Sequence, residues 1–84
     1  MASIAAPPIT PAQCRAARAL LDLSVVRLAG LAVVPRVIVE EFEAAGAPLS
    51  QADLEALRRA LEQAGVVFID PNGGGPGVRL SESD

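Results

Sequence analysis

The chain has 84 residues, with seven Arg and no Lys against ten Asp and Glu, and a net charge of −3 at pH 7. One cysteine and no histidine exclude an intramolecular disulfide, a structural zinc site and His-based catalysis. This length suits one small domain with a modest core. The acidic balance provides no broad basic surface, which non-specific binding to nucleic acid requires.

The chain begins with a predicted arm and a first helix. Residues 1–9 include two adjacent prolines and predict a flexible N-terminal arm. Thr10 followed by Pro11 is typical of the cap and first turn of a helix. We expect Cys14 to be a small buried apolar residue rather than a redox thiol. The apolar face of this helix would comprise Cys14, Ala17, Leu20 and Leu21.

Segment 20–43 predicts two short helices that meet at a sharp corner near Val33. Ser24 is a good N-cap for the first of them, and Pro35 suits the first turn of the second. So short a connection makes the helices cross steeply, as they do where one helix straddles a phosphate backbone and the other enters a major groove. The apolar residues at helical intervals are Leu21, Leu28, Leu31, Val34, Val39 and Phe42.

The second half predicts a long helix. Gly46 and Pro48 end the preceding helix, Ser50 opens an amphipathic helix with a capping-box-like start, and Gly65 ends it. Its opposite face carries charged side chains, as expected for a helix with one side in water. The buried stripe would comprise Leu54, Leu57, Ala60, Leu61 and Ala64.

A short β-hairpin follows, with β-forming runs at 66–69 and 78–80 around the turn 70–77. The glycine-rich turn lacks the Lys-Ser or Lys-Thr and the following helix of a phosphate-binding loop, so a structural turn is favoured. A two-stranded hairpin is only marginally stable alone, so it must pack on the long helix, pair with another copy of itself, or do both. The expected dimerisation residues are Val66, Phe68, Val78 and Leu80. Residues 81–84 predict a frayed tail.

These elements predict a mainly α fold of four helices with a C-terminal hairpin, divided into a helical domain (10–65) and the hairpin (66–80). From Ile9 to Leu80 the chain resembles the small bacterial helix-turn-helix regulators of the Cro and phage-repressor (XRE-like) class. The opening ITPAQCRAARALLDLS is similar to the first helix of that family and the Ser that begins its second. LRRALEQAGVVFIDPNGGGPGVRL resembles the helix, strand and turn that end one subgroup.

The resemblance implies a transcriptional regulator that binds double-stranded DNA as a homodimer. The middle segment departs from the family: Val25 replaces the usual Gln and Val33 the usual Gly. Pro35, Val37 and Ile38 stand where Ser, Arg or Lys, and Thr are common, and Arg36 alone keeps a typical DNA-contacting side chain. The resemblance places DNA contacts at Ser24, Arg27, Arg36, Val37 and Glu40.

A second hypothesis is that the helix-turn-helix contacts a protein partner instead. Clustered Val and Ile side chains are unusual on a surface unless something covers them. A protein partner, the second subunit of a dimer or the N-terminal arm could each provide this cover. The apolar patch in this hypothesis comprises Val25, Val26, Val33, Val37 and Ile38.

Charge leaves two further alternatives open. The first-half arginines either form a local positive face or are solvated residues that balance nearby acids. The arginines concerned are Arg15, Arg18, Arg27 and Arg36, and the acids are Asp22, Glu40 and Glu41. We find no catalytic constellation, so we expect no enzyme activity, no metal and no cofactor. No apolar run approaches the ~20 residues of a membrane span, and the chain start lacks the pattern of a signal peptide, so we expect a cytoplasmic protein.

Overall fold

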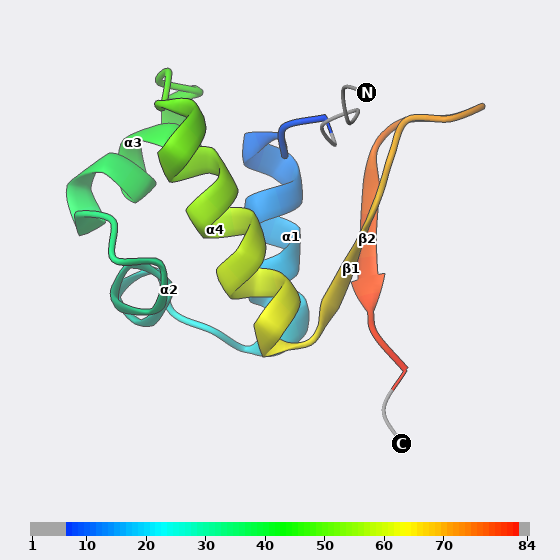
Figure 1. The fold of residues 1–84 in the computed structure, drawn as a ribbon, viewed down its shortest axis with the longest axis horizontal. Helices are drawn as coiled ribbons and strands as arrows, with labels where there is room; N and C mark the ends of the chain where they lie inside the picture. The colour runs from blue at the N-terminus through cyan, green and yellow to red at the C-terminus, as the bar shows by residue number, and fades with distance from the viewer. Residues whose placement is uncertain (1–6, 83–84) are drawn as a thin grey trace, which may run out of the picture.

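The computed structural model describes residues 7–82, which form four helices followed by a two-stranded antiparallel hairpin (Figure 1). This confirms the predicted mainly α fold with a C-terminal hairpin. The elements are α1 (Pro11–Leu21), α2 (Val25–Ala32), α3 (Arg36–Ala45), α4 (Gln51–Ala64), β1 (Val66–Ile69) and β2 (Gly77–Leu80).

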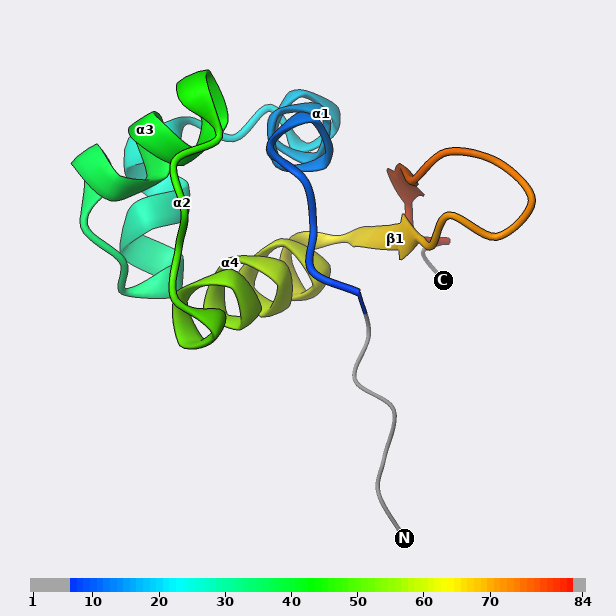
Figure 2. The same cartoon turned by 90° about the horizontal axis from the view of Figure 1, so that it is seen from above.

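Helices α1 and α4 form the centre of the molecule. Figures 1 and 2 show α2 and α3 on one side of this pair and the hairpin on the other. Helix α4 packs against both α2 and β1, while α1 packs against α3 and both strands. The helix-turn-helix and the hairpin therefore occupy opposite sides of the domain.

Local capping explains where most helices begin. Thr10 accepts a hydrogen bond from the Gln13 backbone N–H, and the Gln13 side chain accepts one from the Thr10 N–H, completing a capping box. Ser24 and Ser50 cap α2 and α4 in the same way, each accepting from the N–H three residues on. Pro35 is the exception to our prediction: it is the N-cap of α3, with ψ 137°, and the helix begins at Arg36.

The turn between α2 and α3 has an unusual residue at its corner. Val33 has φ 57° in the left-handed region, where a β-branched side chain is rare and costs roughly 1–3 kcal/mol. Gly46 ends α3 at φ 67° and Gly65 ends α4 at φ 127°, both values that glycine adopts without strain. The chain thus uses glycine at two helix ends and valine at the corner that faces solvent.

The core is built mainly from aliphatic side chains, with two phenylalanines, on all four helices, β1, the α2–α3 linker and the segment before α1. Two sequence predictions fail here, because Leu20 is half-exposed and Ala64 is exposed; Leu31, one of the apolar residues at helical intervals, is also half-exposed. Each lies at the margin of a helical stripe, where the periodicity alone does not decide burial. The buried apolar residues are Ile9, Cys14, Ala17, Leu28, Ala29, Ala32, Val34, Val39, Phe42, Leu57, Ala60, Leu61, Val66 and Phe68.

The predicted arm ends earlier than residue 9. Ile9 is buried in the core, and the Pro7 carbonyl accepts a hydrogen bond of 3.0 Å from Arg58 on α4. The same guanidinium lies 5.3 Å from the centre of the Phe68 ring, which fits a cation–π contact. Residues 7–9 are therefore part of the domain, and the rest of the predicted arm, residues 1–6, lies outside the described residues.

The hairpin presents one face to the helices. Val66 and Phe68 are buried in the core of their own chain, so their side chains are not on the surface that our dimer prediction requires. Ser81 is not frayed, because its N–H donates to the Gly65 carbonyl at 2.8 Å. Residues 83–84 of the predicted tail lie outside the described residues.

No helix within residues 7–82 combines the length and apolar character needed to cross a bilayer.

Candidate nucleic-acid interface

The predicted DNA-contacting residues lie on the outer surface of α2 and α3. Ser24, Arg27, Arg36, Val37 and Glu40 are all exposed. The Ser24 hydroxyl accepts from the Arg27 backbone N–H at 3.0 Å, which leaves its own O–H free to donate. Arg36 Nε lies 3.7 Å from Glu40 Oε2, and both side chains remain largely in water, at 61% and 46% exposure.

The apolar patch is smaller than predicted. Val25 and Ile38 are partly buried and pack against the core, so each offers a partner less apolar surface than an exposed side chain would. Val26, Val33 and Val37 are exposed by 58%, 87% and 54%, as the second hypothesis requires. The patch that remains, Val26, Val33 and Val37, spans the outer side of α2, the corner and the first turn of α3.

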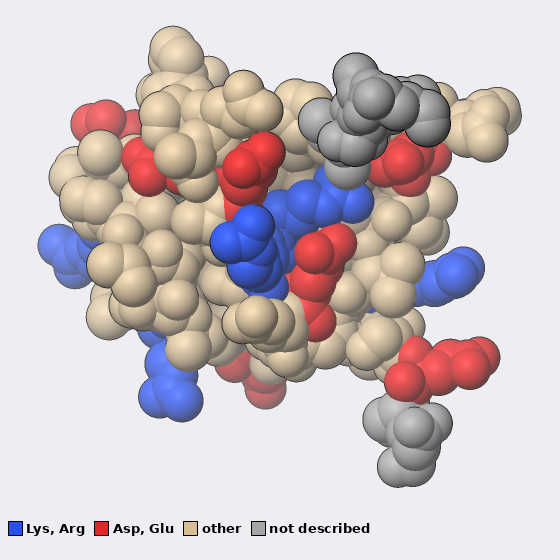
Figure 3. All heavy atoms as spheres, in the orientation of Figure 1, with Lys and Arg blue, Asp and Glu red and all other residues tan. Residues whose placement is uncertain are grey.

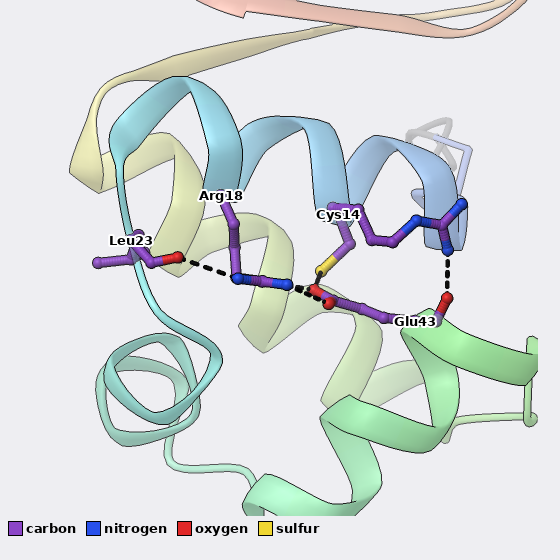
Figure 4. A network of polar contacts seen from close by, with 5 residues as sticks. Cys14, Arg18, Leu23 and Glu43 are labelled. Atoms are coloured by element: carbon purple, nitrogen blue, oxygen red, sulfur yellow. Dashed lines mark hydrogen bonds and ion pairs between the residues drawn. The ribbon is translucent and has the colours of Figure 1, made fainter.

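A polar network between α1 and α3 was not predicted from the sequence (Figure 4). The Glu43 carboxylate, 7% exposed, accepts from Arg18 Nη2 at 2.6 Å and from Arg18 Nε at 2.9 Å. The Cys14 thiol donates to the same carboxylate at 3.0 Å. Arg18 also donates to the Leu23 carbonyl at 3.1 Å, and Arg15 donates to the Glu43 carbonyl. The network therefore joins α1, the α1–α2 linker and α3.

The network changes the protonation behaviour of its members. Burial raises the pKa of Glu43, but hydrogen bonds from Arg18 and Cys14 and the charges of Arg18 and Arg15 outweigh it, so the pKa is lowered. Burial, with the hydrogen bond to Glu43, raises the pKa of the Cys14 thiol far above its ordinary value. Because only a thiolate is reactive, Cys14 behaves as a structural group.

These bonds engage two arginines of the predicted positive face. Arg18 is held by Glu43 and Leu23, and its side chain is only 24% exposed. Arg15 is exposed, but one of its nitrogens is bound to the Glu43 carbonyl. Arg27 and Arg36 are thus the basic side chains that the helix-turn-helix itself offers to a ligand.

Charge on the surface is mixed. Figure 3 shows basic and acidic side chains next to each other over α4, with mostly uncharged atoms on the side where Figure 1 places α2 and α3. On α4, Arg58 pairs with Glu62 at 3.1 Å, which reduces the field of that arginine. This face therefore carries no continuous basic patch.

The lowered pKa of Glu43 predicts a specific loss of stability in acid. A carboxyl with a depressed folded-state pKa stabilises the fold above its unfolded pKa, and that contribution disappears as pH falls through the folded value. We expect the free energy of unfolding to decline below about pH 4.3, the ordinary pKa of Glu. Urea titrations at a series of pH values would measure it. The decline should be shallower in Glu43→Gln, and equal slopes in the two proteins would contradict the assignment.

The placement of the metal-ligating residue types bears on whether the domain holds a metal site. Among the described residues, no group of three or more His, Cys, Asp or Glu is placed to hold a metal ion. Neither a protein-family model nor a curated protein matches this chain.

Proposed function

We propose that the chain is a DNA-binding regulator that inserts α3 into the major groove of double-stranded DNA. The observation that carries the proposal is the outer face of α2 and α3, which is open to solvent and bears Arg27 and Arg36. Helix α2 contributes a capped N-terminus whose Ser24 hydroxyl and first backbone N–H groups suit a phosphate. Two short helices joined by a tight turn can place the second helix in the major groove while the first crosses the phosphate backbone.

Arg36 has the central role in this proposal. It lies at the first position of α3, where recognition helices direct side chains toward base edges. Its contact with Glu40 is an exposed i,i+4 pair, worth about 0.3–0.5 kcal/mol, so DNA can displace it at little cost. Val37, on the same helical turn, offers a methyl surface for a thymine methyl group.

The number of helix-turn-helix arginines that contact phosphates sets how steeply the DNA affinity depends on salt. If Arg27 neutralises one phosphate per subunit and Arg36 contacts either a base edge or a second phosphate, the logarithm of the affinity should fall with the logarithm of salt with a slope between about −0.9 and about −1.8 per subunit. Glu40 and Glu41 are exposed on α3 and repel phosphate, and the chain carries a net charge of −3. Weak non-specific binding and a shallow slope are therefore expected.

The test is capture of fragments from a mixed genomic DNA pool across a salt series, with the oligomeric state measured in the same samples. DNA binding requires that particular fragments are enriched and that their affinity follows the shallow slope given above. If no fragment is enriched even at low salt, the proposed function is wrong.

A second candidate is contact with a protein partner through Val26, Val33 and Val37. The observation in its favour is Val33, which is 87% exposed and still holds a strained backbone conformation where glycine would be unstrained. Val33→Gly removes the side chain and suits the corner, so it should leave DNA affinity unchanged under the first candidate. Loss of fragment capture in Val33→Gly would show that the apolar corner contacts DNA, and it would count against the second candidate.

A further inference from the structure

The turn between β1 and β2 carries an asparagine that is followed directly by a glycine. Asn72 is the one asparagine in the sequence, and glycines occupy positions 73–75 after it. All residues from Asp70 to Pro76 are exposed, and Figure 2 shows this turn projecting on the side of the molecule opposite α2 and α3. Water therefore has free access to the Asn72 side chain.

The surroundings of Asn72 are uncrowded. Apart from chain neighbours, a Cβ placed on any of the three following glycines would meet no atom within 4 Å. The Asn72 N–H donates to the Asp70 carbonyl at 2.8 Å, whereas the Gly73 N–H makes no backbone hydrogen bond within residues 7–82. The main chain therefore does not hold the Gly73 nitrogen, which lies next in the chain to the Asn72 carboxamide.

We propose that Asn72 is a site of spontaneous deamidation, with the Gly73 backbone nitrogen as the nucleophile. This nitrogen attacks the side-chain carbonyl carbon of Asn72 and forms a C–N bond. The bond to the side-chain nitrogen breaks, and that nitrogen leaves as ammonia with the proton of the Gly73 N–H. Water then opens the five-membered succinimide ring at either carbonyl, which gives aspartate or isoaspartate. The whole reaction consumes a water molecule and releases ammonia, so it requires no oxidant, reductant or enzyme.

Glycine at position 73 favours the attack for two reasons. It has no Cβ to shield the nitrogen, and its backbone can turn toward the asparagine side chain at little cost. Gly73 has φ 84°, a conformation that other residues adopt only with strain. Packed neighbours would prevent ring closure at an asparagine in a rigid part of the fold, but Asn72 is followed by glycines in open solvent. The folded chain should therefore react about as fast as the unfolded chain.

The hairpin should survive the reaction, because its base is held independently of the turn. Ile69 pairs with Gly77, and the Gln13 amide donates to the Gly77 carbonyl at 2.9 Å. Isoaspartate routes the backbone through the side-chain carbon and so lengthens it by a methylene group, but this change lies at position 72, outside the ladder. The strands and their packing on α1 therefore remain in place.

Deamidation changes the charge at the tip of the hairpin. The new carboxyl group is ionised at neutral pH, because its ordinary pKa is about 3.9, and it adds a negative charge to the net charge of −3. Charges on opposite sides of the molecule are largely screened beyond about 8 Å at physiological salt. DNA affinity should therefore not change, and the inference does not rest on the proposed function.

Mass spectrometry of the folded full-length chain tests the proposal. The chain is incubated at mildly alkaline pH while circular dichroism confirms that it stays folded, and samples are then cleaved after arginine. We expect peptide 60–79 to gain the mass difference between an acid and an amide and to separate into two products. These should co-elute with synthetic peptides that carry aspartate or isoaspartate at position 72. If the folded chain stays unconverted while the urea-denatured chain converts, the native turn blocks the attack and the proposal is wrong.

Three variants test the roles of the two residues. Asn72→Gln should lose the conversion over the same period, because a glutamine would have to close a less favourable six-membered ring. Gly73→Ala should slow it, because a methyl group crowds the attacking nitrogen. Gly75→Ala is the matched control: it makes the same change in the same open turn, leaves the Asn72–Gly73 pair intact, and should convert at the native rate. Equal slowing in Gly73→Ala and Gly75→Ala would overturn the role of the Gly73 nitrogen.

Discussion

Replacing Glu43 with glutamine is expected to destabilise the fold by about 3 kcal/mol, because it removes one partner from a buried ion pair. The Arg18 guanidinium would lose the negative charge opposite it and one of its two acceptor oxygens, because a glutamine amide has a single oxygen that accepts. Its bond to the Leu23 carbonyl would remain. Arg18 is 24% exposed, so water compensates in part and the lower end of the usual range applies. For a small domain with a total stability of about 5–15 kcal/mol, this is a large fraction.

Urea unfolding of the two proteins would measure this loss as a shift of the midpoint at unchanged slope. Glu40→Gln provides the matched control on the same helix, since its partner Arg36 is largely in water and the change should stay within about 0.5 kcal/mol. Equal midpoints for the native chain and Glu43→Gln would show that the network contributes little to stability.

The network also matters because of where it lies, between α1, the α1–α2 linker and α3. Arg18 and Glu43 connect α1 to α3, and the bond to Leu23 fixes the linker that leads into Ser24 and α2. The helix-turn-helix is therefore held against the rest of the domain by polar contacts as well as by its apolar core. A ligand that binds α3 meets a helix whose orientation is already set.

Helix boundaries could be predicted because the signals are local. Thr10, Ser24 and Ser50 each cap a helix by accepting from the N–H three residues on, and this requires nothing beyond the neighbouring sequence. Gly46 and Gly65 end helices with positive φ for the same reason. Pro35 was misplaced by one position because proline is compatible with both the N-cap and the first turn.

The buried network could not be assigned in the same way, because Glu40, Glu41 and Glu43 are alike as residue types. Only Glu43 follows the buried Val39 by four residues and so falls on the inner stripe of α3. Arg18 likewise follows the buried Cys14 by four. Spacing therefore contained a signal, but pairing the two stripes required the packing of α1 on α3, which is a tertiary contact.

Tertiary packing also decided which apolar residues are exposed. Val25 and Ile38 differ from the pattern of the regulators that the sequence resembles as much as Val37 does, yet they pack against the core. Ile9 follows two prolines and still fills the core. A departure from a family pattern thus identifies a changed residue, whereas its burial depends on neighbours that are distant in sequence.

Arg36→Ala is expected to weaken binding to a captured DNA fragment by roughly 10- to 100-fold, the effect of losing one well-placed arginine contact. The side chain is 61% exposed and makes only a 3.7 Å contact with Glu40, so its loss should leave the fold intact. Fluorescence anisotropy with a labelled fragment would measure the affinity at several salt concentrations. Arg59→Ala, which makes the same charge change on an exposed position of α4, is the control and should alter affinity far less.

The form of the loss tells which part of the DNA Arg36 contacts. A base contact would relax the preference for the captured sequence, whereas a phosphate contact would weaken all sequences alike and reduce the salt slope by about 1. Glu40→Gln should act in the opposite direction, because it releases Arg36 from its acidic neighbour and removes a negative charge from α3. If Arg36→Ala and Arg59→Ala weaken binding equally, α3 does not contact the DNA and only the net charge of the chain matters.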